Sequence, residues 1–175
     1  MTFLPVLPAL TTARLTLRGP EPRDYPALRA FYASDRSNFV GGPKSPEGAW
    51  RQLATEIGHW ALRGYGRWIV TERETGHTVG MVGLWNPEGW PEPEVAWDLF
   101  EGFEGKGYAT EAAHAARDHA YGALGWPTAI SLVNRANTAS ARVAERLGAV
   151  YEGEVTHETY GSIGVYRHPA PEACR

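Results

Sequence analysis

The fold is decided by the stretch Phe103-Glu104-Gly105-Lys106-Gly107-Tyr108-Ala109-Thr110-Glu111-Ala112, which joins a strand-like segment to an alanine-rich helix. Gly105 and Gly107 have no Cβ, so the backbone between them can turn its N–H groups toward one point and let a bulky anion approach. The helix that begins near Tyr108 adds the unpaired N–H groups of its first turn and the positive end of its dipole. The stretch therefore predicts a phosphate-binding turn.

Two other glycine-rich phosphate loops do not fit this spacing. A nucleoside-triphosphate loop requires glycine five residues before Gly-Lys and serine or threonine after it, where this chain has Phe100 and Gly107. A dinucleotide-binding turn read from Gly105 requires glycine or alanine where this chain has Thr110. The spacing that remains is Gly102-x-x-Gly105-x-Gly107, and a tight strand-to-helix turn without a ligand explains it equally well.

The segments on both sides of the turn alternate between strand and helix patterns. Ser45 is a good N-cap with Pro46 after it, and Gly64 ends the apolar helical spacing that follows. We expect helices from Asp24, from Ser45 to Gly64, at about residues 108–120 and at about 138–147, and strands at 14–18, 67–72, 78–84, 94–100, 128–133, 150–156 and 163–167. This order predicts an α+β fold, in which helices flank a mixed, mostly antiparallel central sheet.

Length and charge indicate one domain without a generalised basic surface. The 175 residues predict a single domain over 1–175, with an ordered core at about 12–168 and short N- and C-terminal tails. A formal net charge of −3 argues against a nucleic acid partner. The apolar N-terminal run contains Pro5 and Pro8 and no basic residue, which argues against a signal peptide. No apolar segment is long enough to span a membrane. We expect a cytoplasmic protein without a membrane partner.

Cysteine and histidine positions narrow the chemistry further. Cys174 is the single cysteine and lies in the C-terminal tail, so catalysis through a cysteine is not expected. The histidines do not show the spacing of metal ligands, and no metal site is predicted.

A second motif lies downstream, after the strand at residues 128–133. Asn137 and Ser140 stand three residues apart at the start of a helix. Taken alone, this pair describes only a helix N-cap.

Taken together, the glycine turn and the Asn137-x-x-Ser140 pair resemble the GNAT superfamily of acetyl-CoA-dependent N-acyltransferases. Within that superfamily, the chain is most similar to the ribosomal-protein N-terminal acetyltransferase (RimJ/RimL-like) branch. The similarity extends over nearly the whole chain and includes the segments Arg14-Leu15-Thr16-Leu17-Arg18 and Glu94-Val95-Ala96-Trp97.

This resemblance implies where acetyl-CoA binds. Main-chain donors of the turn would hold the pyrophosphate, at Gly105, Lys106, Gly107, Tyr108, Ala109 and Thr110. Leu99 and its neighbours would pair with the pantetheine amides like an added strand, and Asn137 would bind the pantetheine. Arg142 or Arg146 would reach the ribose phosphate, unless these side chains only form a solvated helix face. Gly102 replaces the Arg or Gln that the superfamily often has there, which removes one side chain from the phosphate site.

The resemblance also implies acetyl transfer to a primary amine by direct attack in a ternary complex. Such an amine is mostly protonated at neutral pH, so a carboxylate is needed as the proton acceptor. Glu94 and Glu158 are the two main candidates and Asp98 is a third, although each is also explained as an ordinary surface charge. Ser140 would offer its hydroxyl to the departing thiolate, or would only hydrogen-bond at the helix start. A backbone N–H exposed by a bulge near Leu99 would stabilise the oxyanion.

The acceptor is predicted only by class. Trp85, Trp90 and Trp97 could line an amine-binding groove, and core packing explains them as well. The acceptor is then a protein N-terminus or a small-molecule amine. The alternative function is a catalytically silent acyl-CoA-binding sensor or regulatory protein. A homodimer through an exposed strand edge or the Trp-rich loop is also possible.

Overall fold

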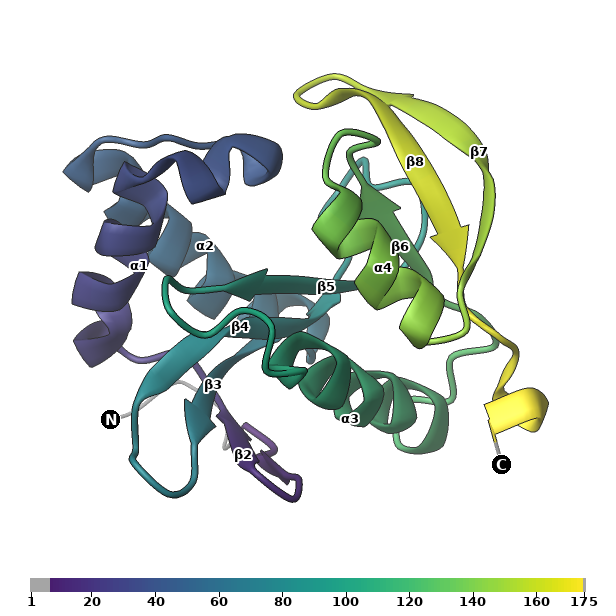
Figure 1. The fold of residues 1–175 in the computed structure, drawn as a ribbon, viewed down its shortest axis with the longest axis horizontal. Helices are drawn as coiled ribbons and strands as arrows, with labels where there is room; N and C mark the ends of the chain where they lie inside the picture. Colours follow the sequence, from purple (N-terminus) through teal and green to yellow (C-terminus); the bar gives the residue numbers. More distant parts are fainter. Residues whose placement is uncertain (1–6, 175) are drawn as a thin grey trace.

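The computed structural model describes residues 7–174, and the structural statements below refer to this part of the chain. A sheet of eight strands forms its centre, in the order β1-β2-β3-β4-β5-β6-β8-β7 (Figure 1). The strands are β1 (Leu10–Thr11), β2 (Leu15–Arg18), β3 (Arg67–Glu72), β4 (Thr78–Trp85), β5 (Glu94–Leu99), β6 (Ile130–Val133), β7 (Val150–His157) and β8 (Gly161–Arg167). Neighbouring strands are antiparallel except β5 and β6, which are parallel. The predicted α+β fold class is confirmed.

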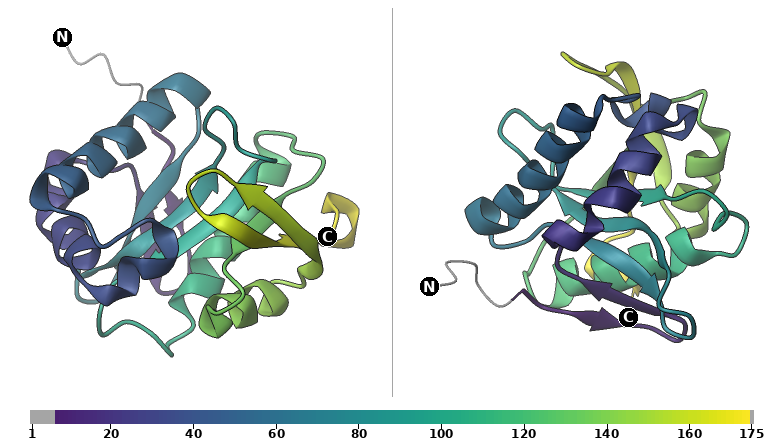
Figure 2. Two further views of the ribbon diagram at one scale, coloured as in Figure 1. Left: turned by 90° about the horizontal axis from the view of Figure 1, so that it is seen from above. Right: turned by 90° about the vertical axis from the view of Figure 1, so that its left-hand side faces the viewer.

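The helices lie on both faces of this sheet. They are η1 (Pro22–Asp24), α1 (Tyr25–Ala33), η2 (Asp35–Val40), α2 (Pro46–Arg63), α3 (Tyr108–Gly122), α4 (Thr138–Arg146) and η3 (Pro171–Cys174), the η segments being 3₁₀ helices. Figure 2 shows α1 and α2 together on one side of the sheet and α3 on the other. The ordered elements extend beyond residues 12–168 on both sides, from Leu10 in β1 to Cys174 in η3.

Small residues let α3 lie close to the sheet. Ala112, Ala113, Ala116 and Ala120 are all fully buried, and they recur at the spacing of one helix face. Their neighbours on the sheet are large apolar side chains of β2, β3 and β4. The close packing holds the N-terminus of α3 at a fixed position beside β5.

On the other face of the sheet, α2 has caps at both ends that the sequence predicts. The hydroxyl of Ser45 accepts a hydrogen bond of 3.1 Å from the N–H of Gly48, with Pro46 as the first residue of α2. Gly64 ends the helix with a positive φ of 76°. The bounds of α2 therefore agree with the prediction.

Four short elements were not predicted. The helix expected from Asp24 is α1, with Asp24 as its N-cap, but the 3₁₀ segments η1 and η2 flank it. β1 and η3 were not predicted either, because two to four residues are too few to show a periodic pattern. Of these elements, η2 matters most because it borders the site described below.

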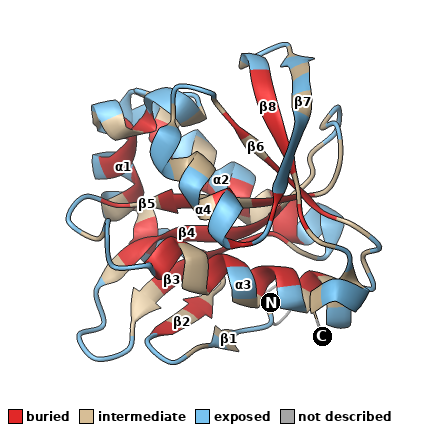
Figure 3. Ribbon diagram, turned by 45° about the vertical axis from the view of Figure 1, so that its right-hand side comes forward, coloured by how far each residue is buried: buried red, intermediate tan, exposed pale blue. Residues whose placement is uncertain are grey.

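The two ends of the sheet differ in exposure. β7 is the outer strand, and most of its residues are exposed, whereas the centre of β8 is buried (Figure 3). A homodimer through this edge stays a prediction. No helix within residues 7–174 is long and apolar enough to cross a membrane.

Candidate functional site

The site lies where β5 and β6 diverge. The two parallel strands share a single register pair, Glu94 with Ile130, and separate beyond it. Two side chains span the strands near this point. The N–H of Leu132 donates to Glu94 Oε1 at 2.9 Å, and Ser131 Oγ donates to the carbonyl of Val95 at 2.5 Å. The rest of β5 keeps an edge without a neighbouring strand, which is what an extended ligand requires.

The prediction of a β-bulge near Leu99 is wrong. β5 pairs with β4 in continuous register from Glu94 to Leu99. On its other edge, β5 has no strand partner near Leu99, because β6 has diverged from it. The main-chain groups there are therefore exposed without the additional residue that a bulge would insert.

The glycine turn leads directly into α3. Gly102, Gly105 and Gly107 all have a positive φ, of 87°, 73° and 80° respectively. A Cβ placed on Gly102 or Gly105 would meet no atom within 4 Å, so the space above the turn is open. Arg14 stabilises the turn through its Nη1, which donates a hydrogen bond of 2.9 Å to the carbonyl of Lys106. The result is an open concave backbone at a helix N-terminus, with the geometry of an anion site.

A groove runs from this turn along β5 to α4. It is lined by Leu99, Gly105, Ala109, Asn137, Arg142 and Arg146, together with residues of α1, η2 and β5. Thr110 Oγ1, in the first turn of α3, is buried and has no hydrogen-bond partner among the described residues. This hydroxyl is not among the groups that line the groove, so the fit to a phosphate rests on the open backbone of the turn. With Arg142 and Arg146 as cations on the opposite wall, the groove fits coenzyme A.

The predicted cofactor residues fall into two groups. Leu99, Gly105, Ala109, Asn137 and Arg142 line the groove. Lys106, Gly107, Tyr108 and Thr110 belong to the turn and the first turn of α3 and are not among the residues that line the groove, so their contact with the ligand through main-chain groups stays a prediction. The side chain of Tyr108 points elsewhere, since its hydroxyl donates to Glu72 and its ring lies 4.7 Å from the guanidinium of Arg14.

Sequence reasoning missed Arg36, from η2. Its Nη2 donates to the carbonyl of Leu99 at 3.0 Å, and its Nη1 pairs with Glu104 on the glycine turn. Arg36 thus occupies the β5 carbonyl that an extended ligand would use. An arginine in a short 3₁₀ segment carries no sequence pattern that indicates this contact.

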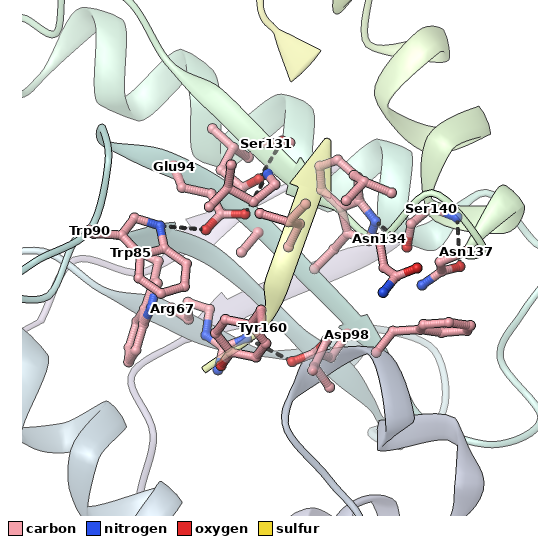
Figure 4. Close-up of a pocket in the computed structure, with 18 of the residues that line it drawn as sticks. Arg67, Trp85, Trp90, Glu94, Asp98, Ser131, Asn134, Asn137, Ser140 and Tyr160 are labelled. Atoms are coloured by element: carbon pink, nitrogen blue, oxygen red, sulfur yellow. Dashed lines mark hydrogen bonds and ion pairs between the residues drawn. The ribbon is translucent and has the colours of Figure 1, made fainter. Parts of the chain in front are cut away.

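A second cavity, which we call the acceptor chamber, opens from the inner end of the groove (Figure 4). The two cavities share wall residues from η2, β5 and the start of α4, which are Phe39, Val40, Trp97, Asp98, Asn137 and Ser140. In Figure 4, Asn137 and Ser140 lie at one end of the chamber and Trp85 and Trp90 at the other. The two predicted motifs and the tryptophans therefore border one continuous space.

Asn137 and Ser140 stand at the junction of groove and chamber. Asn137 is the N-cap of α4, and its side-chain oxygen accepts from the N–H of Ser140 at 3.2 Å. Trp97 Nε1 donates to Ser140 Oγ at 3.3 Å. Because the hydroxyl oxygen accepts from Trp97, its own proton is available to the space between the cavities. The main-chain N–H of Ser140 can therefore take part in the helix cap while its hydroxyl faces the junction of the two cavities.

Glu94 is one of two acidic side chains that line the chamber. It is only 5% exposed. Burial raises its pKa to about 7, against the opposing hydrogen bonds from the Leu132 N–H and from Trp90 Nε1, the latter 2.8 Å long. A carboxylate with this pKa is a good general base near neutral pH.

The other two predicted carboxylates are placed differently. Asp98 also lines the chamber and burial raises its pKa, but its Oδ2 accepts from Arg67 Nη1 at 2.7 Å. Glu158 is exposed in the turn between β7 and β8, and it is not among the residues that line the chamber. The structure thus brings Glu94, Asp98 and Ser140 to one chamber and leaves Glu158 outside it.

Arg67 forms the floor of the chamber together with two acids. It pairs with Asp98 and with both oxygens of Glu56, with Nε 3.1 Å from Oε2 of that residue. Its guanidinium also lies 5.0 Å from the ring of Trp85. All three charged side chains are at least nine-tenths buried, so Arg67 is fully committed to its own protein neighbours.

A network of buried polar side chains contacts Ser131, which lines the chamber. His168 Nε2 donates to Ser131 Oγ at 2.9 Å, and Arg117 Nη1 lies 3.3 Å from His168 Nδ1. Burial, together with the charge of Arg117, lowers the pKa of His168 to about 3. His168 is therefore neutral at physiological pH. Within the described residues, no cluster of three or more His, Cys, Asp or Glu side chains could hold a metal ion.

Comparisons with known proteins agree with this geometry. A family model described as an acetyltransferase (GNAT) domain matches residues 14–150. YkkB of Bacillus subtilis (strain 168) is 30% identical over 151 residues, covering 81% of this chain and 85% of that protein.

Solved structures extend the comparison to the whole chain. An acetyltransferase from Agrobacterium tumefaciens str. C58 is 38% identical with a TM-score of 0.86, over 97% of this chain and 98% of that one. A ribosomal L7/L12 α-N-protein acetyltransferase in complex with coenzyme A is 20% identical with a TM-score of 0.71, over 95% and 97% of the two chains. At 20% identity the similarity shows a shared fold.

Proposed function

The chain belongs to the GNAT acetyltransferase family, and we propose that it moves the acetyl group of acetyl-CoA to a primary amine by direct attack in a ternary complex. The enzyme is an N-acetyltransferase, and its acetyl donor is acetyl-CoA. The acceptor is a small-molecule amine or a protein N-terminus.

One observation carries the proposal: the groove that fits coenzyme A and the chamber that holds Glu94 meet at Ser140. The donor and the acceptor can therefore occupy the protein together and face each other at this junction. Holding two reactants in a fixed orientation removes much of the entropic barrier of a bimolecular reaction.

The side chains divide the work of the reaction. The glycine turn, the first turn of α3 and Asn137 hold the donor, which when bound supplies an acetyl group activated as a thioester. Glu94, directly or through a water molecule, accepts the proton that the amine nitrogen loses as its bond to the acetyl carbon forms and the C–S bond breaks. Ser140 donates a hydrogen bond to the departing sulfur.

A covalent acyl-cysteine is not part of the proposal. Cys174 lies in η3, and its Sγ is 3.8 Å from the carbonyl oxygen of Pro169. It is not among the residues that line either the groove or the chamber. This placement supports direct attack by the amine.

The test is acetyl transfer by matched variants. Purified protein is given acetyl-CoA and a panel of amines, and acetylated product is measured by mass spectrometry together with thiol release. Glu94→Gln is expected to lower kcat by about 100-fold or more, the usual size of a general-base contribution. Glu158→Gln and Cys174→Ala are the controls and are expected to retain turnover.

Other outcomes decide against the proposal. A larger loss in Glu158→Gln than in Glu94→Gln would assign the base to the hairpin turn instead. Binding of coenzyme A with no transfer to any amine would support the silent acyl-CoA sensor.

A further inference from the structure

Two lining residues of the acceptor chamber, Trp90 and Tyr160, belong to an aromatic cluster. The rings of Trp90 and Tyr160 lie 5.9 Å apart, and His157 lies 4.8 Å from the first and 5.0 Å from the second. Trp90 belongs to the loop between β4 and β5, whereas the other two belong to the hairpin of β7 and β8. The cluster therefore joins two segments that are far apart in the sequence into one wall.

Tyr160 continues this wall across the chamber. A Cβ built on Gly41, just after η2, would lie 3.4 Å from the Tyr160 hydroxyl oxygen. Tyr160 thus extends from the Trp90 side to the segment between η2 and α2. Tyr160 lines the same chamber as Arg67 and Asp98, and Figure 4 labels all three side chains. An extended polypeptide entering from this side would have to displace Tyr160, whereas a small molecule would not.

Charge further restricts what the chamber can accept. Glu94 and Asp98 both line it, and Arg67 is its only cationic lining residue among those described. Arg67 is already paired with Asp98 and with Glu56 behind it. An acceptor that carries its own carboxylate would face acidic neighbours with no free cation, which is unfavourable.

The remaining walls are mixed. Trp85, Trp90, Tyr32 and Ile163 form the apolar part, and Gln52, Asn134 and Asn137 add neutral polar side chains. Aromatic walls suit an apolar body, and their ring faces also attract an ammonium group before it loses its proton.

From these features we infer that the acceptor is a small primary amine with an apolar body and without a carboxylate, rather than a protein N-terminus or a free amino acid. This inference rests on the proposed function and specifies its second substrate. The cationic amine enters the chamber, loses its protons to solvent and Glu94, and leaves as a neutral amide.

Three acceptors with the same side chain test this inference. Phenethylamine has the amine and the ring alone, phenylalanine adds a carboxylate, and phenylalanyl-alanyl-alanine amide adds a neutral peptide chain. With acetyl-CoA as donor, kcat/KM for phenethylamine is expected to exceed that for each of the other two by at least about tenfold. Coenzyme A binding is measured in parallel by calorimetry.

The outcomes separate the inference from the function on which it rests. A kcat/KM for the peptide or the amino acid that equals or exceeds that for phenethylamine overturns the inference and leaves the N-acetyltransferase proposal intact. Coenzyme A binding without acetylation of any of the three overturns the inference, and only silence across the whole panel of amines also overturns the N-acetyltransferase proposal.

A variant of the chamber wall gives an independent check. Tyr160→Ala is expected to raise the ratio of peptide to phenethylamine turnover by about tenfold, because it opens the outer side. Tyr151→Ala is the matched control, since Tyr151 lies on the same hairpin but stacks 4.5 Å from the guanidinium of Arg135. An unchanged ratio in Tyr160→Ala overturns the inference.

Discussion

At the scale of single residues, the function depends on a few polar groups whose surroundings set their chemistry. Glu94 and Glu158 are the same residue type, but only the former is buried in the chamber. Burial raises the pKa of Glu94 to about 7, whereas Glu158 lies outside the chamber. The sequence could name both residues, but it could not choose between them, because their difference arises from packing.

Ser140 offers a direct test at this scale. Its main-chain N–H caps α4 through Asn137, and this bond is retained when the side chain is shortened. Ser140→Ala is therefore expected to lower kcat by about 100-fold while changing the Kd for coenzyme A little. Ser140→Thr keeps a hydroxyl and is expected to recover part of the rate. A loss of coenzyme A binding with unchanged kcat would show that the hydroxyl serves only the helix start.

His168 predicts how stability depends on pH. Its pKa in the folded protein is about 3, below the value of about 6.5 for an unfolded histidine. Between these values the unfolded chain binds more protons, so the free energy of unfolding falls as the pH decreases through this window. Urea unfolding of the wild type and His168→Gln at about pH 7 and pH 4 measures the effect.

The expected result is that the stability advantage of the wild type over His168→Gln shrinks at the lower pH. Glu94 acts in the opposite sense, because its pKa is raised, but it is present in both proteins and cancels in the difference. A difference that is the same at both pH values would contradict the assignment of His168 as a neutral buried group.

At the scale of elements, the glycine turn and α3 form one unit. Gly105 has a φ of 73°, where a side chain costs about 1–2 kcal/mol. Gly105→Ala is expected to weaken coenzyme A binding about tenfold, because the turn must shift its N–H groups to relieve that strain. Gly122→Ala, at the other end of α3 with open space around it, is the control and is expected to bind normally. Calorimetric titration with coenzyme A distinguishes them, and equal Kd values for both variants would remove the turn from the site.

Elements with local signals were predictable from the sequence. The glycines at the turn, the Ser45 cap and the alanine face of α3 each have a spacing that fixes the structure nearby. The contact of Arg36 with Leu99 has no such signal, because it joins residues 63 positions apart through tertiary packing. The same holds for the wall that Trp90 and Tyr160 build, which only the folded sheet brings together.

At the scale of the whole molecule, the divergence of β5 and β6 organises the site. It leaves an edge of β5 unpaired, and the side chains of Glu94 and Ser131 span the strands where they part. One face of the opening leads to the glycine turn and the other to the acceptor chamber. A carboxylate that joins the two strands is also the proposed base, so the architecture and the chemistry share the same residue.

The most direct test of the account is the pH dependence of kcat/KM for the acceptor, measured with the wild type and Glu94→Gln. This parameter reports the ionisation of the free enzyme, provided that the amine has a much higher pKa than the enzyme group. We expect the wild-type profile to bend at an apparent pKa of about 7, and the Glu94→Gln profile to be lower and to show only the steady rise that deprotonation of the amine gives. A bend at the same apparent pKa in Glu94→Gln would contradict Glu94 as the base.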